Sequence, residues 1–305
     1  MESSEPGLAS GRRKFSWRQR LRYRGGETIL RAPFVWWRHR GLRPSDVFIA
    51  TYPRSGYTWL RFLLFDILTG RSAQFREVDA AIPYISRQAG ALPMLPGEGR
   101  LLATHETYRR EYRRAIYMVR DVRDVAVSEF LREQAKGLVT DIDDYLAKFL
   151  AGKKRHGAWT DHVSSWLDSG ISNNGNLLVL RYEDLHREPE DTLRRAVDFL
   201  GVRVRADSIP RAIADNSIER MRAKEDAANT TVRGKGEDGR FVRKGAIGQW
   251  TTQLTERQVR CMEICTEGML LRMGYPFLSS LEESKAQSET AGANAGSATQ
   301  IATGA

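Results

Sequence analysis

The segment from Thr51 to Trp59 could bind a phosphate or sulfate group, and it reads T-Y-P-R-S-G-Y-T-W. Gly56 lets the backbone approach a ligand closely. Ser55 and Thr58 supply hydroxyl donors, and Arg54 supplies a permanent positive charge. The usual loop for nucleoside triphosphates reads G-x-x-x-x-G-K-[ST], and its glycine–lysine pair is missing here. The residue types therefore indicate an anion-binding loop of another kind.

The flanking pattern supplies the elements that would position this loop. An apolar run at Val47–Ala50 predicts a strand, and a helical pattern from Thr58 to Thr69, stopped by Gly70, predicts the following helix. The first turn of such a helix presents unpaired N–H groups at the positive end of its dipole. The loop would therefore receive anion oxygens at a strand–loop–helix junction.

Similar patterns recur along the chain. Short apolar runs predict further strands at 101–104, 115–119 and 177–180. Helical patterns occupy 124–134, 142–150, 158–167, 190–200, 217–227 and 256–272. Strands separated by helices favour a single α/β domain with a central parallel sheet flanked by helices.

Four segments in order resemble the motifs of sulfotransferases that use 3'-phosphoadenosine 5'-phosphosulfate (PAPS). The loop is similar to the family's T-Y-P-K-S-G-T-T-W, and Y-M-V-R-D-V-R-D-V-A-V-S at 117–128 resembles its 3'-phosphate segment. R-Y-E-D-L at 181–185 resembles its Y-E-D-L segment, and R-K-G-A-I-G-Q-W at 243–250 resembles its R-K-G-x-x-G-x-W signature. The resemblance implies a cytosolic-type sulfotransferase domain, which we expect to be bacterial.

The resemblance also implies how the donor is bound. The 5'-phosphosulfate would lie in the P-loop-like segment 54–59, and a second set of residues would hold the 3'-phosphate. Tyr182 would lie near the adenine, as would Ile218, which stands in the family's T-S-F position. No metal is expected, because the protein's cations neutralise the donor. The residues expected to contact PAPS are Arg54, Ser55, Gly56, Tyr57, Thr58, Trp59, Arg120, Ser128, Tyr182, Ile218, Arg243, Lys244 and Gly245.

His105 and Arg54 are the candidate catalytic residues. His105 follows the predicted strand 101–104, near the end where ligands gather in parallel sheets, and it resembles the family's catalytic histidine. A neutral imidazole with a pKa near its usual value of about 6.5 could take the acceptor's proton, and Glu106 is the next candidate base. Arg54, which replaces the family's lysine, would be a fixed electrostatic stabiliser. We expect the other histidines to be structural or exposed: His39, His156, His162 and His186.

The predicted function is transfer of the PAPS sulfonate group to a hydroxyl or amine. One alternative is a kinase-like enzyme that grips phosphates, but the loop lysine with a following magnesium-binding Ser or Thr is absent. The acceptor stays open between a small aromatic or lipid alcohol, a glycan and a peptide. Its pocket would be built from the loops at 80–99 and 223–240, and the first of these has several apolar residues.

The other alternative follows from charge. The chain has 48 Lys+Arg against 38 Asp+Glu, a formal net charge of +10. Ten basic residues and one acidic residue lie between Arg12 and Arg40, interleaved with aromatics. Such an arm could bind nucleic acid or contact an anionic membrane surface. We expect instead an arm, residues 1–45, that packs on the domain through its aromatics, with no nucleic-acid partner and with peripheral membrane contact left open.

The remaining expectations concern the ends and the cysteines. The domain would span 46–278, and the Ala/Gly/Ser/Thr-rich stretch 279–305 would be a disordered tail. Cys261 and Cys265, spaced i, i+4 on a helix, would be buried as apolar packing. No apolar stretch reaches the roughly 20 residues that span a bilayer, and no secretory signal is found, so we expect a cytoplasmic protein. The oligomeric state is not predicted.

Overall fold

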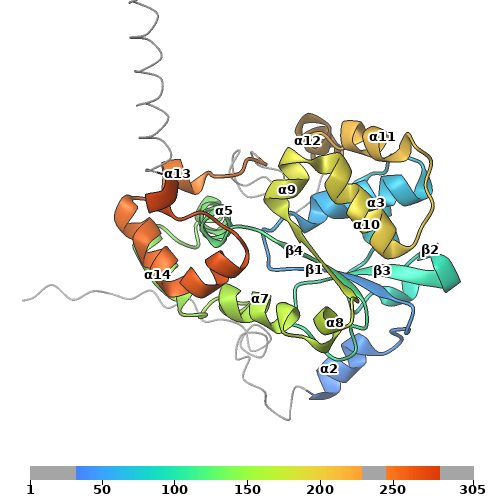
Figure 1. Ribbon diagram of the computed structural model, residues 1–305, viewed down its shortest axis with the longest axis horizontal. Helices are drawn as coiled ribbons and strands as arrows, with labels where there is room; N and C mark the ends of the chain where they lie inside the picture. The colour runs from blue at the N-terminus through green and yellow to red at the C-terminus, as the bar shows by residue number, and fades with distance from the viewer. Residues whose placement is uncertain (1–31, 229–244, 282–305) are drawn as a thin grey trace, which may run out of the picture. The chain divides into compact units, whose positions relative to one another are not determined.

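The computed structural model describes residues 32–228 and 245–281 (Figure 1). The chain divides at Arg40 into two units. The first contains the helix α2 (Ala32–His39), on which Trp36 is 69% exposed and Trp37 is 48% exposed. The second unit begins at Gly41 and contains every other element described below.

A five-stranded sheet with the order β2-β3-β1-β4-β5 forms the centre of the second unit. The four strands from β3 to β5 in this order pair in parallel, while the short edge strand β2 pairs with β3 in the antiparallel direction. The predicted α/β fold is confirmed, although the sheet is mixed at one edge rather than parallel throughout. The strand bounds are β1 Val47–Thr51, β2 Pro93–Leu95, β3 Gly99–Thr104, β4 Ala115–Val119 and β5 Leu177–Arg181.

Alternate residues of the central strands enter two different hydrophobic cores. Val47 and Ile49 of β1 belong to one core, and Phe48 and Ala50 belong to the other. Successive side chains of a strand point to opposite faces, so a sheet covered on both faces needs apolar residues at every position. This requirement explains why β1 reads V-F-I-A-T without a polar alternation.

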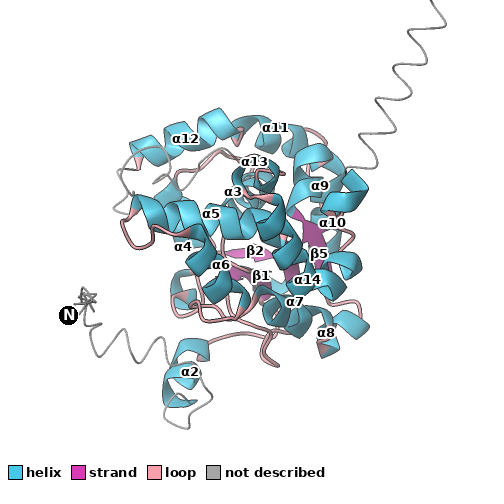
Figure 2. Ribbon diagram, turned by 90° about the vertical axis from the view of Figure 1, so that its left-hand side faces the viewer, coloured by secondary structure: helices cyan, strands magenta, loops and turns pink. Residues whose placement is uncertain are grey.

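The helices divide between the two faces of the sheet. One face carries the helices whose apolar residues join Val47 and Ile49: α3 Tyr57–Thr69, α4 Phe75–Ala81, α9 Tyr182–Arg187, α10 Pro189–Leu200, α11 Ser208–Asp215 and α12 Ile218–Ala227. The other face carries α5 Val122–Ala135, α6 Ile142–Leu150, α7 Trp159–Leu167, α8 Gly170–Asn173, α13 Trp250–Gln253 and α14 Glu256–Arg272. Figure 2 shows α11 and α12 on one side of the strands and α7 and α8 on the other.

The predicted strands and long helices are present with bounds close to those expected. The elements that were not predicted are short or lie at an edge: α4, α8, α9, α11, α13 and β2. No helix of the described ranges is long and apolar enough to cross a membrane. The predicted tail begins at Ser279, which is still helical, and continues beyond Leu281 outside the described residues.

The prediction for the two cysteines is wrong, because both thiols are exposed on α14. The inward face of this helix is occupied by Val259, Met262 and Met269, which belong to the core. An i, i+4 pair shares one helical face, and here that face points outward. The i, i+4 spacing correctly predicts that the two cysteines share a helical face, but it does not predict whether that face points toward the core or toward solvent.

This exposure predicts fast thiol labelling. In the folded protein, both Cys261 and Cys265 should react with Ellman's reagent, because both residues are exposed. Burial and the neighbouring Cys261 raise the pKa of Cys265, so Cys265 should react more slowly than in denaturant. Single Cys261→Ser and Cys265→Ser variants assign the two reactions. Labelling that occurs only after unfolding would contradict the orientation of α14.

Candidate active site

The loop between β1 and α3 has the backbone shape of an anion site. Arg54 has φ 69° and Gly56 has φ 86°, and both values lie in the left-handed region. A Cβ on Gly56 would stand 2.3 Å from Cδ2 of Tyr182, so only glycine fits. Left-handed residues before a helix start turn backbone N–H groups toward a common point, where an anion is stabilised.

Unpartnered polar atoms in this loop and at the end of β4 provide a test of whether the anionic groups of the donor fit. Ser55 is fully buried, and its hydroxyl has no hydrogen-bond partner within the described part of the chain. Nε of Arg120, a residue that is 5% exposed, is likewise unpartnered there. A buried donor without an acceptor costs about 1–3 kcal/mol. Oxygen atoms of a bound phosphosulfate and of a 3'-phosphate would satisfy such donors, so the residues present fit a nucleotide that carries both groups.

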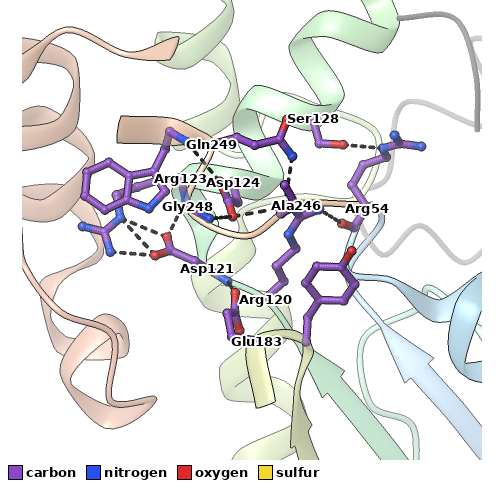
Figure 3. A network of polar contacts seen from close by, with 12 residues as sticks. Arg54, Arg120, Asp121, Arg123, Asp124, Ser128, Glu183, Ala246, Gly248 and Gln249 are labelled. Atoms are coloured by element: carbon purple, nitrogen blue, oxygen red, sulfur yellow. Dashed lines mark hydrogen bonds and ion pairs between the residues drawn. The ribbon is translucent and has the colours of Figure 1, made fainter. Parts of the chain in front are cut away.

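Arg120 stands at the end of β4 and contacts two other segments (Figure 3). Its guanidinium donates to the backbone oxygen of Arg54 at 3.0 Å and to that of Ala246 at 2.9 Å. It also lies over the ring of Tyr182, with 4.5 Å from Cζ to the ring centroid. The hydroxyl of Ser128 accepts from Nε of Arg54 at 3.0 Å. Arg54, Arg120 and Ser128 therefore form one cationic cluster, and Arg54 is close to both predicted anion sites.

The segment 245–250 closes this cluster from the other side. Tyr182 donates its hydroxyl to the backbone oxygen of Gly245 at 3.0 Å. Gly245 has φ 60°, and a Cβ on it would stand 2.6 Å from Cδ1 of Ile218, so these two predicted residues touch. The predicted residues Arg243 and Lys244 lie outside the described residues.

Buried carboxylates that the sequence analysis did not single out hold this arrangement. Asp124 on α5 accepts from the backbone N–H of Gly248 at 2.8 Å and from that of Trp250 at 3.1 Å. Burial raises the pKa of Asp124, while the charge of Arg120 acts in the opposite direction. Fully buried Arg123 pairs with Asp121 at 2.6 Å and with Glu263 of α14 at 2.5 Å. The only available signal was the unusual run R-D-V-R-D between β4 and α5.

An aromatic group lies beside the loop. The indole of Trp59 donates to the backbone oxygen of Asn216 at 2.9 Å. The ring of His186 is 4.8 Å from Trp59 and 4.6 Å from Tyr182, measured between centroids. His186 therefore packs beside the predicted adenine residues, which agrees with a structural role. Burial lowers its pKa to about 4, and Arg120 contributes in the same direction.

His105 lies at the carboxyl end of β3, where the sequence placed it. Its Nδ1 atom is 2.9 Å from the backbone oxygen of Thr51 and 3.0 Å from the hydroxyl oxygen of that residue. Nε2 is 2.7 Å from the hydroxyl of Tyr84. Since the Thr51 carbonyl can only accept, Nδ1 carries the proton and Nε2 has a free lone pair. The adjacent Glu106 accepts a hydrogen bond from Tyr112 at 3.0 Å.

Two further histidines, which were expected to be structural or exposed, lie next to His105. The ring of His156 is 5.9 Å from that of His105, and Nε2 of His162 is 3.3 Å from the backbone oxygen of His105. Burial, and then the charge of His156, lowers the pKa of His105 to about 3. The expected pKa near 6.5 is therefore wrong, because the ring lies in a group of buried imidazoles rather than in solvent. His105 is neutral throughout the physiological range.

Comparison with known proteins settles the family. A model of the sulfotransferase domain matches residues 44–272. The chain belongs to this family. Sulfotransferase 2A6 from Mus musculus is 27% identical over 254 residues, which cover 77% of this chain and 87% of the relative. Sulfotransferase 1 family member D1 from Rattus norvegicus is 29% identical over 244 residues, covering 72% and 82%.

Solved structures show the same fold. Retinol dehydratase in a complex with retinol and PAP is 22% identical, with a TM-score of 0.65 and coverage of 78% of this chain and 86% of that one. A mouse sulfotransferase complexed with PAP is 23% identical, with a TM-score of 0.60 and coverage of 77% and 87%. The predicted family, the PAPS-dependent enzyme class and PAPS as sulfonate donor are confirmed. Among the described residues, no group of three or more His, Cys, Asp or Glu side chains could hold a metal ion.

The close approach of Gly56 and Tyr182 predicts a specific loss of donor binding. Gly56→Ala adds a methyl group that overlaps the Tyr182 ring, so affinity for PAP should fall by more than about tenfold, a loss of about 1.4 kcal/mol. Isothermal titration calorimetry measures this change.

Gly70→Ala is the matched control. Gly70 also has a positive φ, of 72°, but the nearest atom to its added Cβ is 3.7 Å away. It carries the same backbone strain of about 1 kcal/mol without the overlap, and it should keep its affinity for PAP. Equal losses in the two variants would contradict a steric role for Gly56.

The buried histidines predict acid sensitivity of the fold. Their pKa values are lowered to about 3 for His105, about 4 for His156 and about 3 for His162. Between pH 6.5 and 4 these histidines become protonated in the unfolded chain but stay neutral in the folded chain. The free energy of unfolding should therefore fall with falling pH, by up to about 1.4 kcal/mol per pH unit for each histidine. Urea unfolding at several pH values measures the slope. His156→Gln should flatten it by about one proton, and an unchanged slope would show that His156 titrates normally.

Proposed function

We propose that this sulfotransferase moves the sulfonate group of PAPS to a hydroxyl or amine of a small-molecule acceptor, with His105 as general base. The observation that carries the proposal is the attachment of His105 to Thr51, the last residue of β1, directly before the anion loop. The candidate base and the loop are thus parts of one rigid junction. The ring of Tyr57, at the start of α3, packs 4.8 Å from the His105 ring and joins the same junction.

The tautomer of His105 suits a base. Donation from Nδ1 to the Thr51 backbone oxygen leaves Nε2 able to take a proton. Its lowered pKa keeps the ring neutral, but it also makes the charged form unfavourable before substrates bind. A bound donor carrying several negative charges would counteract the neighbouring imidazoles and raise the proton affinity of the ring.

The cationic cluster would bind the donor and stabilise charge on the leaving group. We assign the 5'-phosphosulfate to the loop 54–59, with Arg54 as a fixed electrostatic stabiliser. We assign the 3'-phosphate to Arg120, Ser128, Arg243, Lys244 and the N–H of Gly245, and the adenine to Trp59, Tyr182 and Ile218. Their convergence at the loop, β4 and segment 245–250 supports these assignments for the residues that are described.

The acceptor side is aromatic close to His105. Tyr57 and Tyr84 both pack against its ring, with centroids 4.8 and 5.3 Å away. Retinol dehydratase has been solved with retinol and with androsterone, both apolar alcohols. We propose an apolar alcohol or a phenol for this chain as well, bound beside the segment 80–99.

We also propose limits for the catalytic domain, a location for the protein and a role for the basic arm. The catalytic domain would span 46–278 of a cytoplasmic enzyme, preceded by the basic arm and followed by a disordered tail. The exposed Trp36 and Trp37 beside Arg38 and Arg40 support peripheral contact of the arm with an anionic membrane surface.

The reaction is tested with PAPS labelled in its sulfonate group and a panel of acceptors. The panel contains 2-naphthol, dodecanol, a steroid alcohol, a disaccharide and a tyrosine peptide, and calorimetry with PAP measures donor binding separately. Transfer of label to an apolar alcohol or phenol is the expected result. A protein that binds no PAP would overturn the proposal entirely.

The base is tested by His105→Ala. Turnover should fall by about 10²–10⁴-fold, the usual contribution of a general base, while affinity for PAP is retained. Glu106→Gln is the comparison variant, because Glu106 adjoins His105 in sequence but its carboxylate is bound to Tyr112. Loss of turnover in the Glu106 variant alone would assign the role of base to Glu106.

A further inference from the structure

The hydroxyl of Tyr84 occupies the only free nitrogen of the candidate base. It lies 2.7 Å from Nε2 of His105. Nδ1 is protonated and donates to Thr51, so Nε2 can only accept, and the Tyr84 O–H is its donor. An acceptor hydroxyl therefore cannot reach Nε2 directly while Tyr84 is in place.

The backbone fixes Tyr84 in this position. Its neighbours Pro83 and Ile85 are bonded to Ala103 of β3: the Ala103 N–H donates to the oxygen of Pro83 at 2.9 Å, and the Ile85 N–H donates to the oxygen of Ala103 at 3.0 Å. Tyr84 thus forms a parallel bridge with Ala103, two residues before His105. The backbone from which the phenol extends is therefore held at a set place relative to His105.

Packing of the ring reinforces this placement. The ring centroid of Tyr84 is 5.2 Å from that of Tyr57 and 5.3 Å from that of His105. The guanidinium of Arg61, bound to Asp79 at 2.9 Å, lies 6.0 Å from the Tyr84 centroid. Burial raises the pKa of Tyr84, with smaller contributions from Tyr57, so the phenol remains protonated. A protonated phenol has one proton to give and lone pairs that can accept another.

We propose that Tyr84 is a catalytic residue that passes the proton of the acceptor hydroxyl to His105. This proposal rests on the proposed function above. The acceptor oxygen forms a bond to sulfur, and the bond from sulfur to the phosphate oxygen breaks, with its electron pair leaving on PAP. The acceptor's proton moves to the oxygen of Tyr84, while the proton of Tyr84 moves to Nε2. Tyr84 ends neutral, and His105 ends as an imidazolium.

The relay explains how a neutral, buried imidazole can serve as base beside an aromatic acceptor site. The phenol extends the reach of His105 toward the acceptor, so the hydroxyl that reacts need only contact the oxygen of Tyr84. The imidazolium that results stays bound on both nitrogens, to Thr51 and to Tyr84, and each contact stabilises its charge.

The test compares Tyr84→Phe with Tyr117→Phe. The control removes a second buried phenol that is bonded to a histidine, because the hydroxyl of Tyr117 is 2.9 Å from Nδ1 of His162. His162 contacts the backbone oxygen of His105 rather than its Nε2 atom, so the control leaves the proposed proton path intact. Circular dichroism and thermal unfolding establish that both variants fold, and calorimetry with PAP establishes that both bind the donor.

The rate is measured with PAPS and the most rapidly sulfonated member of the acceptor panel. If the panel gives no turnover, the reaction measured is PAPS hydrolysis, in which water is the acceptor. Tyr84→Phe should lower kcat by about 10- to 100-fold, part of the usual contribution of proton transfer, with KM for PAPS unchanged. Tyr117→Phe should keep its kcat. The rate is also measured in mixtures of H₂O and D₂O. For the unchanged protein, its dependence on the deuterium fraction should have the form expected for the transfer of two protons. For the residual rate of Tyr84→Phe, it should have the form expected for one proton.

Other outcomes overturn the relay in distinguishable ways. An unchanged or higher kcat in Tyr84→Phe would show that the phenol only fills the base's position and is displaced by the acceptor. A sulfonate group found on Tyr84 by mass spectrometry after incubation with PAPS would make the phenol an acceptor instead of a carrier. Absence of all turnover in a protein that binds PAP would overturn the transfer reaction itself, and absence of PAP binding would overturn the proposed function at its donor side.

Discussion

The guanidinium of Arg120 is the interaction on which the rest of the site depends. It joins the loop after β1, the end of β4 and the segment before α13, which come from three distant parts of the sequence. A planar cation with several donors can bind three such segments at once, and a lysine could not repeat this geometry. The two carbonyl oxygens that it binds here are weaker partners than phosphate oxygens, so a phosphate at the proposed site would compete well for the guanidinium.

Buried carboxylates make this concentration of positive charge tolerable. Asp124 and Asp121 lie within the same turn as Arg120 and Arg123, and each carboxylate also receives backbone N–H groups. Charges removed from water need both a partner and hydrogen bonds, and the α5 start supplies both. The chain of contacts continues from Arg123 through Glu263 to α14, so this helix helps to hold the start of α5 in place.

Local sequence was sufficient for the four parallel strands, for the long helices and for the position of the loop between β1 and α3. Apolar runs at 47–50 and 115–119 are buried on both faces, and a strand buried in this way cannot be polar, so the pattern predicts it well. The loop could be predicted because its glycine, hydroxyl residues and arginine are consecutive. Asp124, which binds Gly248 and Trp250, could not be singled out, since its role depends on a contact across 124 and more positions.

The surroundings of His105 could not be predicted from the sequence for a similar reason. His156, His162 and Tyr84 approach it from the loop before α7, from α7 and from the loop after α4, and no spacing rule connects them. The prediction for Cys261 and Cys265 fails for another reason. The helical period of α14 is clear from the sequence, but the orientation of the helix is set by the core that it covers. The prediction for Ile218 rests on a weak motif match, and Ile218 does contact Gly245.

The attachment of segment 83–85 to β3 has a consequence for how this enzyme can diversify. Its bonds to β3 are made by backbone N–H and carbonyl groups, so they do not depend on which side chains the segment carries. The side chains are more constrained, because Ile85 is buried in the core and Tyr84 packs against Tyr57 of the donor loop. A change at position 84 would therefore alter the surroundings of His105 and the start of α3 together, while the backbone course of the segment stayed the same.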